Sequence, residues 1–199
     1  MKNLLKLFGS FSVVLFLIPN IFGPILTHNY NWISETISTL MVNGAENKIF
    51  MDLFIFFSAV FIQFYSILFY FVCNSFNKIQ RLKLSFFLFI SGVLGELIIF
   101  FPWNNEGLSN VSSIIHITAV GLGLIDFILI VFLFYLFSKQ GNYKKFSLIS
   151  FLIVLISGLI ATLMEFILVE YIGLFERISI FSFMIWFAVT IFFIDRENS

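Results

Sequence analysis

The sequence predicts an all-α polytopic membrane protein: a single domain of six transmembrane helices with both termini on the cytoplasmic side. Of its 199 residues, 60% are hydrophobic and only 11% are charged, and the mean hydropathy is +1.06. Soluble domains are roughly 45–50% apolar and about 25% charged, so the chain has more apolar surface than a soluble core could bury. Six long apolar stretches and a one-sided distribution of basic residues complete the prediction.

The composition also excludes several functional classes. Eleven basic residues balance eleven acidic ones without a dense basic patch, which argues against binding of nucleic acid. The single cysteine, Cys73, cannot form a disulfide within the chain. The sequence has no Walker-type phosphate loop, no CxxC pair and no HExxH spacing, so we predict neither a cofactor nor a metal site.

The six spans follow from the thickness of the bilayer, whose core of about 30 Å requires roughly 20 apolar residues per helix. The stretches that qualify are about 7–27, 49–73, 84–101, 113–137, 146–169 and 176–194. They are continuous rather than alternating, which favours helices over strands. The first follows Lys2 and Lys6 as a secretory signal would, but it lacks a small-residue cleavage site, so we expect a retained helix.

Basic residues predict the orientation, because loops rich in Lys and Arg remain in the cytoplasm. With both termini inside, only Lys48 and Arg177 are outside. The inner side then carries Lys2, Lys6, Lys78, Arg81, Lys83, Lys139, Lys144, Lys145 and Arg196. We therefore predict a multi-pass protein of the cell membrane with cytoplasmic N- and C-termini.

Ionisable residues inside the spans suggest a polar pocket, since such residues usually face the interior of a bundle or a wet cavity. Helical spacing places Asp52, Glu96, His116 and Glu165 on stripes with small or polar neighbours, towards the outer ends of four helices. Asp126 lies near the middle of the bilayer. If the stripes pack against one another, the four outer residues line an outward-facing polar pocket.

The loop before the second span could cover this pocket. Between Asn31 and Met41, apolar residues recur at helical spacing, which is typical of a short interfacial helix; they are Ile33, Ile37, Leu40 and Met41. An irregular loop with chance periodicity explains the same pattern almost as well.

Three segments together form a recognisable pattern. The first is Tyr30 followed by Ile37-Ser38-Thr39-Leu40 and Gly44-Ala45, and the second is Phe101-Pro102 followed by His116. These resemble the "Y…ISeLG…ga" segment and the "FP…H" element of domain of unknown function 998, a family of six-helix bacterial and archaeal membrane proteins. The final-helix signature "G-L-x-[EQ]-R-I…W" is similar to residues 173–178 with Trp186. Thr39 departs from the usual acidic residue, and Glu35, one helical turn earlier, could substitute for it.

The resemblance implies the six-helix fold and no established activity. A fainter similarity links the first outer loop and the histidine to a eukaryotic family that includes autophagy modulators and a factor in GPI-anchor lipid remodelling. That similarity hints at lipid handling, but it is an analogy of fold only.

Our first functional hypothesis is binding of a membrane lipid or amphiphile in the outward-facing pocket, without catalysis. Arg177 could hold a headgroup, because a planar guanidinium binds phosphate or carboxylate well. Alternatively, Arg177 pairs with Glu96 or Glu165 and holds the last helix to the bundle. The predicted ligand-binding residues are Arg177, Glu176, Glu35, Asp52 and Asp126.

Two further hypotheses come from other classes. A lipid hydrolase or transferase would use His116 as general base, Glu96 or Glu165 to orient it, and Ser34 or Ser38 as nucleophile. For His116 we favour the simpler role of an interhelical hydrogen bond. A small proton-coupled transporter would use Asp126, which could equally be a protonated carboxyl in the core. The oligomeric state stays open.

Overall fold

The computed structural model describes residues 1–104, 107–139, 141–167 and 169–197, and within these it leaves the side chains of 164–167, 169 and 194–197 undescribed. Three 3₁₀ helices lie between the long helices: η1 (Ile37–Met41), η2 (Gly107–Ser109) and η3 (Val169–Tyr171). The long helices are α1 (Lys2–Leu26), α2 (Lys48–Val72), α3 (Lys78–Phe100), α4 (Val111–Phe137), α5 (Gly141–Ile167) and α6 (Ile172–Glu197).

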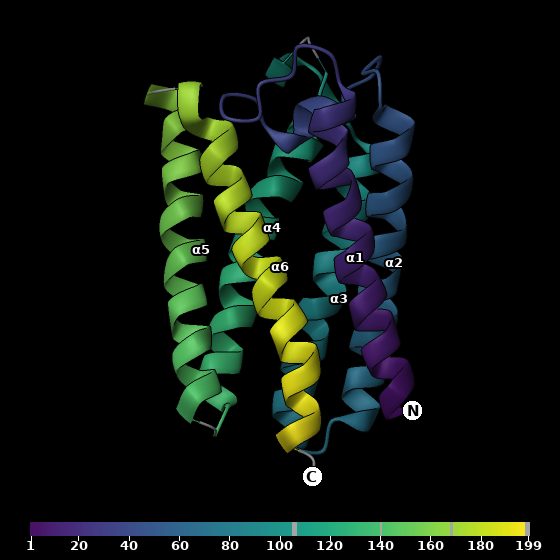
Figure 1. Cartoon of the computed structure of the whole chain (residues 1–199), viewed down its shortest axis with the longest axis vertical. Helices are drawn as coiled ribbons and strands as arrows, with labels where there is room; N and C mark the ends of the chain where they lie inside the picture. Colours follow the sequence, from purple (N-terminus) through teal and green to yellow (C-terminus); the bar gives the residue numbers. More distant parts are fainter. Residues whose placement is uncertain (105–106, 140, 168, 198–199) are drawn as a thin grey trace.

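All six long helices are long and apolar enough to cross a membrane, and the described residues contain no strand. The prediction of an all-α, six-helix membrane protein is therefore confirmed. The observed helices begin up to six residues before the predicted spans, because hydropathy locates the apolar part of a helix and not the polar turns that extend it. The start of α1 and the end of α6 lie at the same end of the bundle (Figure 1). We call this the inner end and the opposite end the outer end.

The helices form a ring in which each packs against its neighbours in sequence. Contacts run from α1 to α2 and onward to α6, which returns to α1 and closes the ring. Figure 1 shows α6 crossing the front of the bundle between α5 and α1. Because α6 completes the ring, its outer end meets the loop between α1 and α2, although the two segments lie far apart in the sequence.

Local signals explain several helix ends. Asn77 and Gln80 form a capping box at the start of α3, each side chain accepting from the backbone N–H of the other at 2.9 and 3.0 Å. The Asn110 side chain accepts from the N–H of Ser112 at the start of α4. α3 ends at Phe100, just before Pro102, because proline disfavours a helical residue before it.

The inner half of the ring is filled by aromatic side chains. The largest that are fully buried are Trp186, Tyr65, Phe69, Phe134, Phe183 and Phe187. The indole N–H of Trp186 donates to the Ser147 hydroxyl at 3.1 Å, which satisfies its polar group inside the core. This aromatic cluster joins α2, α4 and α6 across the middle of the ring.

The outer half is filled partly by the loop between α1 and α2. Ile37, Leu40 and Met41 of η1 are buried against Met51 and Ile55 of α2. The predicted short helix is therefore present only over residues 37–41, and as a 3₁₀ helix. Its apolar residues point into the bundle, so the loop closes the outer mouth of the ring.

Gly92 allows α3 to approach α2 closely. A Cβ at this position would lie 2.7 Å from the carbonyl oxygen of Ala59 and 2.5 Å from the Gln63 side chain. Backbone atoms cannot move aside as a flexible side chain can, so the helices would have to separate. Such close approach through small residues is typical of helix pairs in membranes.

We predict that Gly92→Ala lowers the free energy of unfolding by about 1–3 kcal/mol, the usual cost of overpacking. The measurement is unfolding in detergent micelles. Gly121→Ala is the matched control, because a Cβ at Gly121 of α4 would meet nothing within 4 Å. Equal stability of the two variants would contradict this account of the α2–α3 contact.

Candidate functional site

A buried arginine joins α6 to the loop at the outer end. Arg177 is only 4% exposed, and its Nη1 donates to the carbonyl oxygens of Trp32 and Glu35 at 2.8 Å and of Gly173 at 3.0 Å. Its Nη2 donates to the hydroxyl of Tyr30. Because a guanidinium buried without acceptors is very costly, these bonds fix the loop against α6.

Tyr30 links Arg177 to the backbone of the loop through its hydroxyl. Its hydroxyl accepts from Arg177 and lies 2.8 Å from the carbonyl oxygen of Thr36 and 3.0 Å from that of Glu35, to which it donates. Its ring centroid is 5.5 Å from the guanidinium carbon, within cation–π range. Burial raises the pKa of the phenol above its usual value, although the Arg177 charge acts against this shift. The phenol therefore keeps the proton that it donates.

Three neighbours of Arg177 on α6 also bind the loop. A Glu176 carboxylate oxygen accepts from the N–H of Ile37 at 2.7 Å, at the first residue of η1. The N–H of Leu174 donates to the carbonyl of Ile33 at 2.9 Å. Gly173 has no room for a side chain, because a Cβ there would overlap the carbonyl group of Glu35. We call Tyr30, Gly173, Glu176 and Arg177, with the loop carbonyls they contact, the outer clamp.

The base of the loop is held by a second set of bonds. The backbone N–H and the ring of His28 bond to the carboxylate of Glu46, at 2.9–3.1 Å, and Asn47 donates to the Thr27 hydroxyl at 3.0 Å. The bonds from the backbone and ring of His28 lower the pKa of Glu46. This contribution to stability is present above the unfolded-state pKa and is lost as the pH falls through the lower folded-state value.

Of the two carboxylates that the sequence suggests for Arg177, the structure describes only Glu96, and it describes no bond between Glu96 and Arg177. Every hydrogen bond described for Arg177 goes to Gly173 or to the loop, whereas Glu96 accepts from Gln63 of α2 at 2.9 Å. The loop places carbonyl oxygens within reach of the guanidinium. A neutral carbonyl oxygen can accept a hydrogen bond from arginine as a carboxylate can. The side chain of Glu165 lies outside those described.

Asp52 of the predicted pocket and three other candidate site residues have separate partners. Asp52 pairs with Lys48 one turn earlier on α2, and Ser38 bonds to the Thr36 hydroxyl at 2.9 Å. The Glu35 side chain accepts from the N–H of Asn31 at 3.3 Å. Asp126, deep in α4, bonds to Ser91 of α3. The structure thus distributes these residues over several contacts and describes no hydrogen bond between any two of Asp52, Glu96 and His116.

His116 joins the start of α4 to the end of α3. It is 3% exposed, and its Nδ1 lies 3.0 Å from the carbonyl oxygen of Phe101, which can only accept. Nδ1 therefore carries the hydrogen, and Nε2 is buried without a described partner. The hydroxyl of Ser112 donates to the Pro102 carbonyl at 2.7 Å in the same connection. This arrangement agrees with the interhelical hydrogen bond that we favour for His116.

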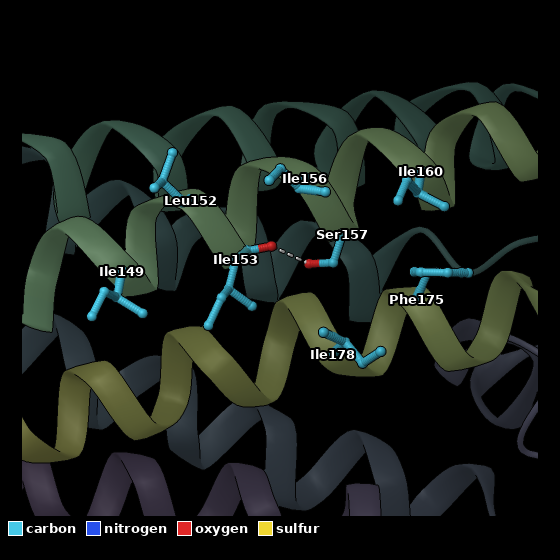
Figure 2. A pocket seen from close by; sticks show the side chains of 8 residues that line it. All are labelled: Ile149, Leu152, Ile153, Ile156, Ser157, Ile160, Phe175 and Ile178. Atoms are coloured by element: carbon cyan, nitrogen blue, oxygen red, sulfur yellow. Dashed lines mark hydrogen bonds between the residues drawn. The ribbon is translucent and has the colours of Figure 1, made fainter.

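An apolar groove runs between α5 and α6 on the outside of the bundle. Its volume is about 320 Å³, and its lining residues are Ile149, Leu152, Ile153, Ile156, Ser157, Ile160, Phe175 and Ile178. In Figure 2, Phe175 and Ile178 come from α6 and the other lining side chains come from α5. The only hydroxyl in the lining, on Ser157, donates back to the Ile153 carbonyl at 2.6 Å, so the groove offers no free polar group. No pattern in the sequence indicated this groove.

No group of three or more His, Cys, Asp and Glu residues suited to a metal ion occurs among the residues that the structure describes. The six-helix fold, the loop held by the outer clamp and the groove between α5 and α6 define a polytopic membrane protein with a closed outer mouth and an apolar lateral groove.

The chain belongs to the family described as "Protein of unknown function (DUF998)", whose family model matches residues 11–192. The resemblance noted in the sequence is thereby confirmed, while the fainter eukaryotic similarity stays a prediction. No curated protein and no solved structure matches the chain.

The family segments noted in the sequence meet in the structure. Tyr30 and the stretch 37–40 come from the loop, and residues 173–178 supply Gly173, Glu176 and Arg177 of the outer clamp. The first and last residues of the "FP…H" element also meet, because His116 bonds to the carbonyl oxygen of Phe101. Sequence reasoning identified these residues but did not pair Tyr30 with Arg177, since neither the spacing of two residues 147 positions apart nor the backbone carbonyls that Arg177 also contacts leave a signal in a sequence.

We predict that Tyr30→Phe lowers the free energy of unfolding by about 1–3 kcal/mol, because it leaves a buried donor and buried acceptors unsatisfied. The measurement is thermal or chemical unfolding in detergent. Tyr171→Phe serves as control: Tyr171 is 47% exposed at the same end, and its loss should change stability by less than about 0.5 kcal/mol. If both variants are equally stable, Tyr30 has no part in holding the loop.

Proposed function

We propose that this protein binds a membrane lipid or a similar amphiphile without catalysing a reaction on it, and that the groove between α5 and α6 receives an acyl chain. The observation that carries the proposal is the groove itself. It lies on two helices that can span the membrane, where lipid chains surround the protein. From Ile149 to Ile160 it extends roughly 16 Å along α5, at a 1.5 Å rise per residue.

The chemistry of the lining supports an apolar occupant. Seven of the eight lining residues are aliphatic or aromatic, and the one hydroxyl is bonded within its own helix. Branched side chains exposed on both walls, such as Ile156 at 55% and Ile178 at 38%, offer dispersion contacts along a chain. A polar ligand would lose its hydration here without gaining a hydrogen bond.

The position of the outer clamp bears on where a headgroup would lie. Phe175 and Ile178 line the groove from the same stretch of α6 that carries Glu176 and Arg177. Because the hydrogen bonds described for Arg177 go to the loop and to Gly173, we assign it the role of holding the loop and not of holding a phosphate. The lipid is therefore recognised through its chain.

Catalysis is not favoured by the geometry. A nucleophile and its base must be within hydrogen-bonding reach, and Ser38 bonds to Thr36 whereas Nδ1 of His116 bonds to Phe101. We therefore keep binding as the proposed activity.

We predict that Ile153→Trp reduces the lipid that survives purification, because the indole fills the groove. The measurement is native mass spectrometry of protein released from detergent. Ile185→Trp is the matched control, since Ile185 is exposed on α6 outside the groove lining. Wild-type protein without retained lipid, or equal occupancy in the two variants, would overturn the proposal.

We also propose the cell membrane as location, with both termini in the cytoplasm, from the excess of Lys and Arg at the inner end. We predict that Asn43→Cys, in the outer loop, reacts with a membrane-impermeant maleimide on intact cells. Asn3→Cys should react only after permeabilisation, and native Cys73 is buried and should remain unlabelled. The reverse labelling pattern would show the opposite orientation.

A further inference from the structure

A carboxyl group lies deep in the bundle, away from the outer clamp and the groove. Asp126 is 4% exposed and lies about 22 Å from the start of α4, a helix about 40 Å long. One carboxyl oxygen, Oδ2, contacts the hydroxyl of Ser91 on α3. The other, Oδ1, is buried without a described hydrogen-bond partner.

The groups around Asp126 include no described cation at its depth. On α4 itself the nearest titratable groups are His116, ten residues towards the outer end, and Tyr135 towards the inner end. Lys and Arg of α3 and α5 lie at the inner ends of those helices: Lys78, Arg81, Lys83, Lys144 and Lys145. Among the side chains that the structure describes, the remaining titratable groups of the helices that pack against α4 all have partners away from Asp126. They are Glu96 of α3, which accepts from Gln63, Tyr143 near the start of α5, which bonds to Thr190, and Glu176 and Arg177 in the outer clamp. The side chains of Glu165, Asp195, Arg196 and Glu197 lie outside those described.

Counting hydrogens distinguishes the two states of the carboxyl. The Ser91 hydroxyl has one hydrogen but two oxygen neighbours, Asp126 Oδ2 and the carbonyl of Phe87 at 3.3 Å. If Asp126 is ionised, Ser91 can serve only one of them. If Oδ2 carries a proton, Asp126 donates to Ser91 and Ser91 donates to Phe87, so both contacts are hydrogen bonds.

We propose that Asp126 is a proton-binding site inside the membrane, with Ser91 as the hydrogen-bond acceptor for the bound proton. This inference goes beyond lipid binding and does not rest on it. An uncompensated carboxylate at this depth is costly, which favours the protonated form. On release, the O–H bond breaks, the proton passes to a water molecule, and the electron pair stays on the carboxylate.

Proton release is thereby linked to the packing of α3 against α4. Asp126 is only 4% exposed and its Oδ1 is buried, so we expect that water must enter between the two helices before the proton can leave. Once ionised, Asp126 takes the Ser91 hydrogen and the bond to Phe87 is lost. Proton occupancy and separation of the two helices are therefore coupled.

Infrared difference spectroscopy of the purified protein tests the proposal. At neutral pH, wild type should show the C=O stretching band of a protonated carboxyl, and Asp126→Asn should lose it. Glu96→Gln is the matched control, since it removes the carboxyl that α3 contributes to the bundle and should keep the band. Ser91→Ala should shift the band, because the carboxyl proton loses its acceptor.

Absence of the band in wild type, or its persistence in Asp126→Asn, would overturn the proposal. If Asp126→Asn does not fold, Ser91→Ala decides: a band at the wild-type position would mean that the protonated group is not Asp126. None of these outcomes depends on whether lipid is retained in the groove.

Discussion

Burial of the Arg177 guanidinium at the outer end is the constraint on which the upper part of the bundle depends. A charge that is almost completely removed from water must find acceptors within the chain, and Arg177 finds them mainly in carbonyl groups of a loop some 140 residues away in sequence. The loop in turn places η1 over the ring and supplies the apolar side chains that the outer ends of α2 and α3 need. The buried charge of Arg177 therefore holds the loop against α6, and with it the position of η1 and the apolar cluster at the outer end.

Below this level the bundle has a different construction. The inner half is joined by aromatic packing around Trp186, where shape and dispersion decide the fit. Between the two apolar clusters lie isolated polar pairs, Gln63 with Glu96 and Ser91 with Asp126, each linking α3 to one neighbour. Because one pair faces α2 and the other faces α4, the two pairs together restrict rotation of α3 about its axis.

The sequence predicted the six helices because the bilayer imposes a length and a composition on each of them. It also singled out Arg177, His116 and Asp126, since charged groups in apolar spans are rare. It could not predict the partner of Arg177, because any carboxylate or carbonyl would satisfy a guanidinium. Nor could it predict the groove, which depends on how the side chains of α5 and α6 leave space between them. Periodicity reports which face of a helix is apolar, but not how closely two such faces fit.

The closed outer mouth has a consequence for how a hydrophobic molecule reaches this protein. With η1 seated over the ring, arrival from the aqueous phase through the centre is blocked, and the groove opens sideways between two helices. A molecule would reach it by lateral diffusion after dissolving in the bilayer. Its effective concentration would then follow its partition coefficient, so that apparent affinities referred to bulk water would rise with alkyl chain length even where the contacts in the groove stay the same.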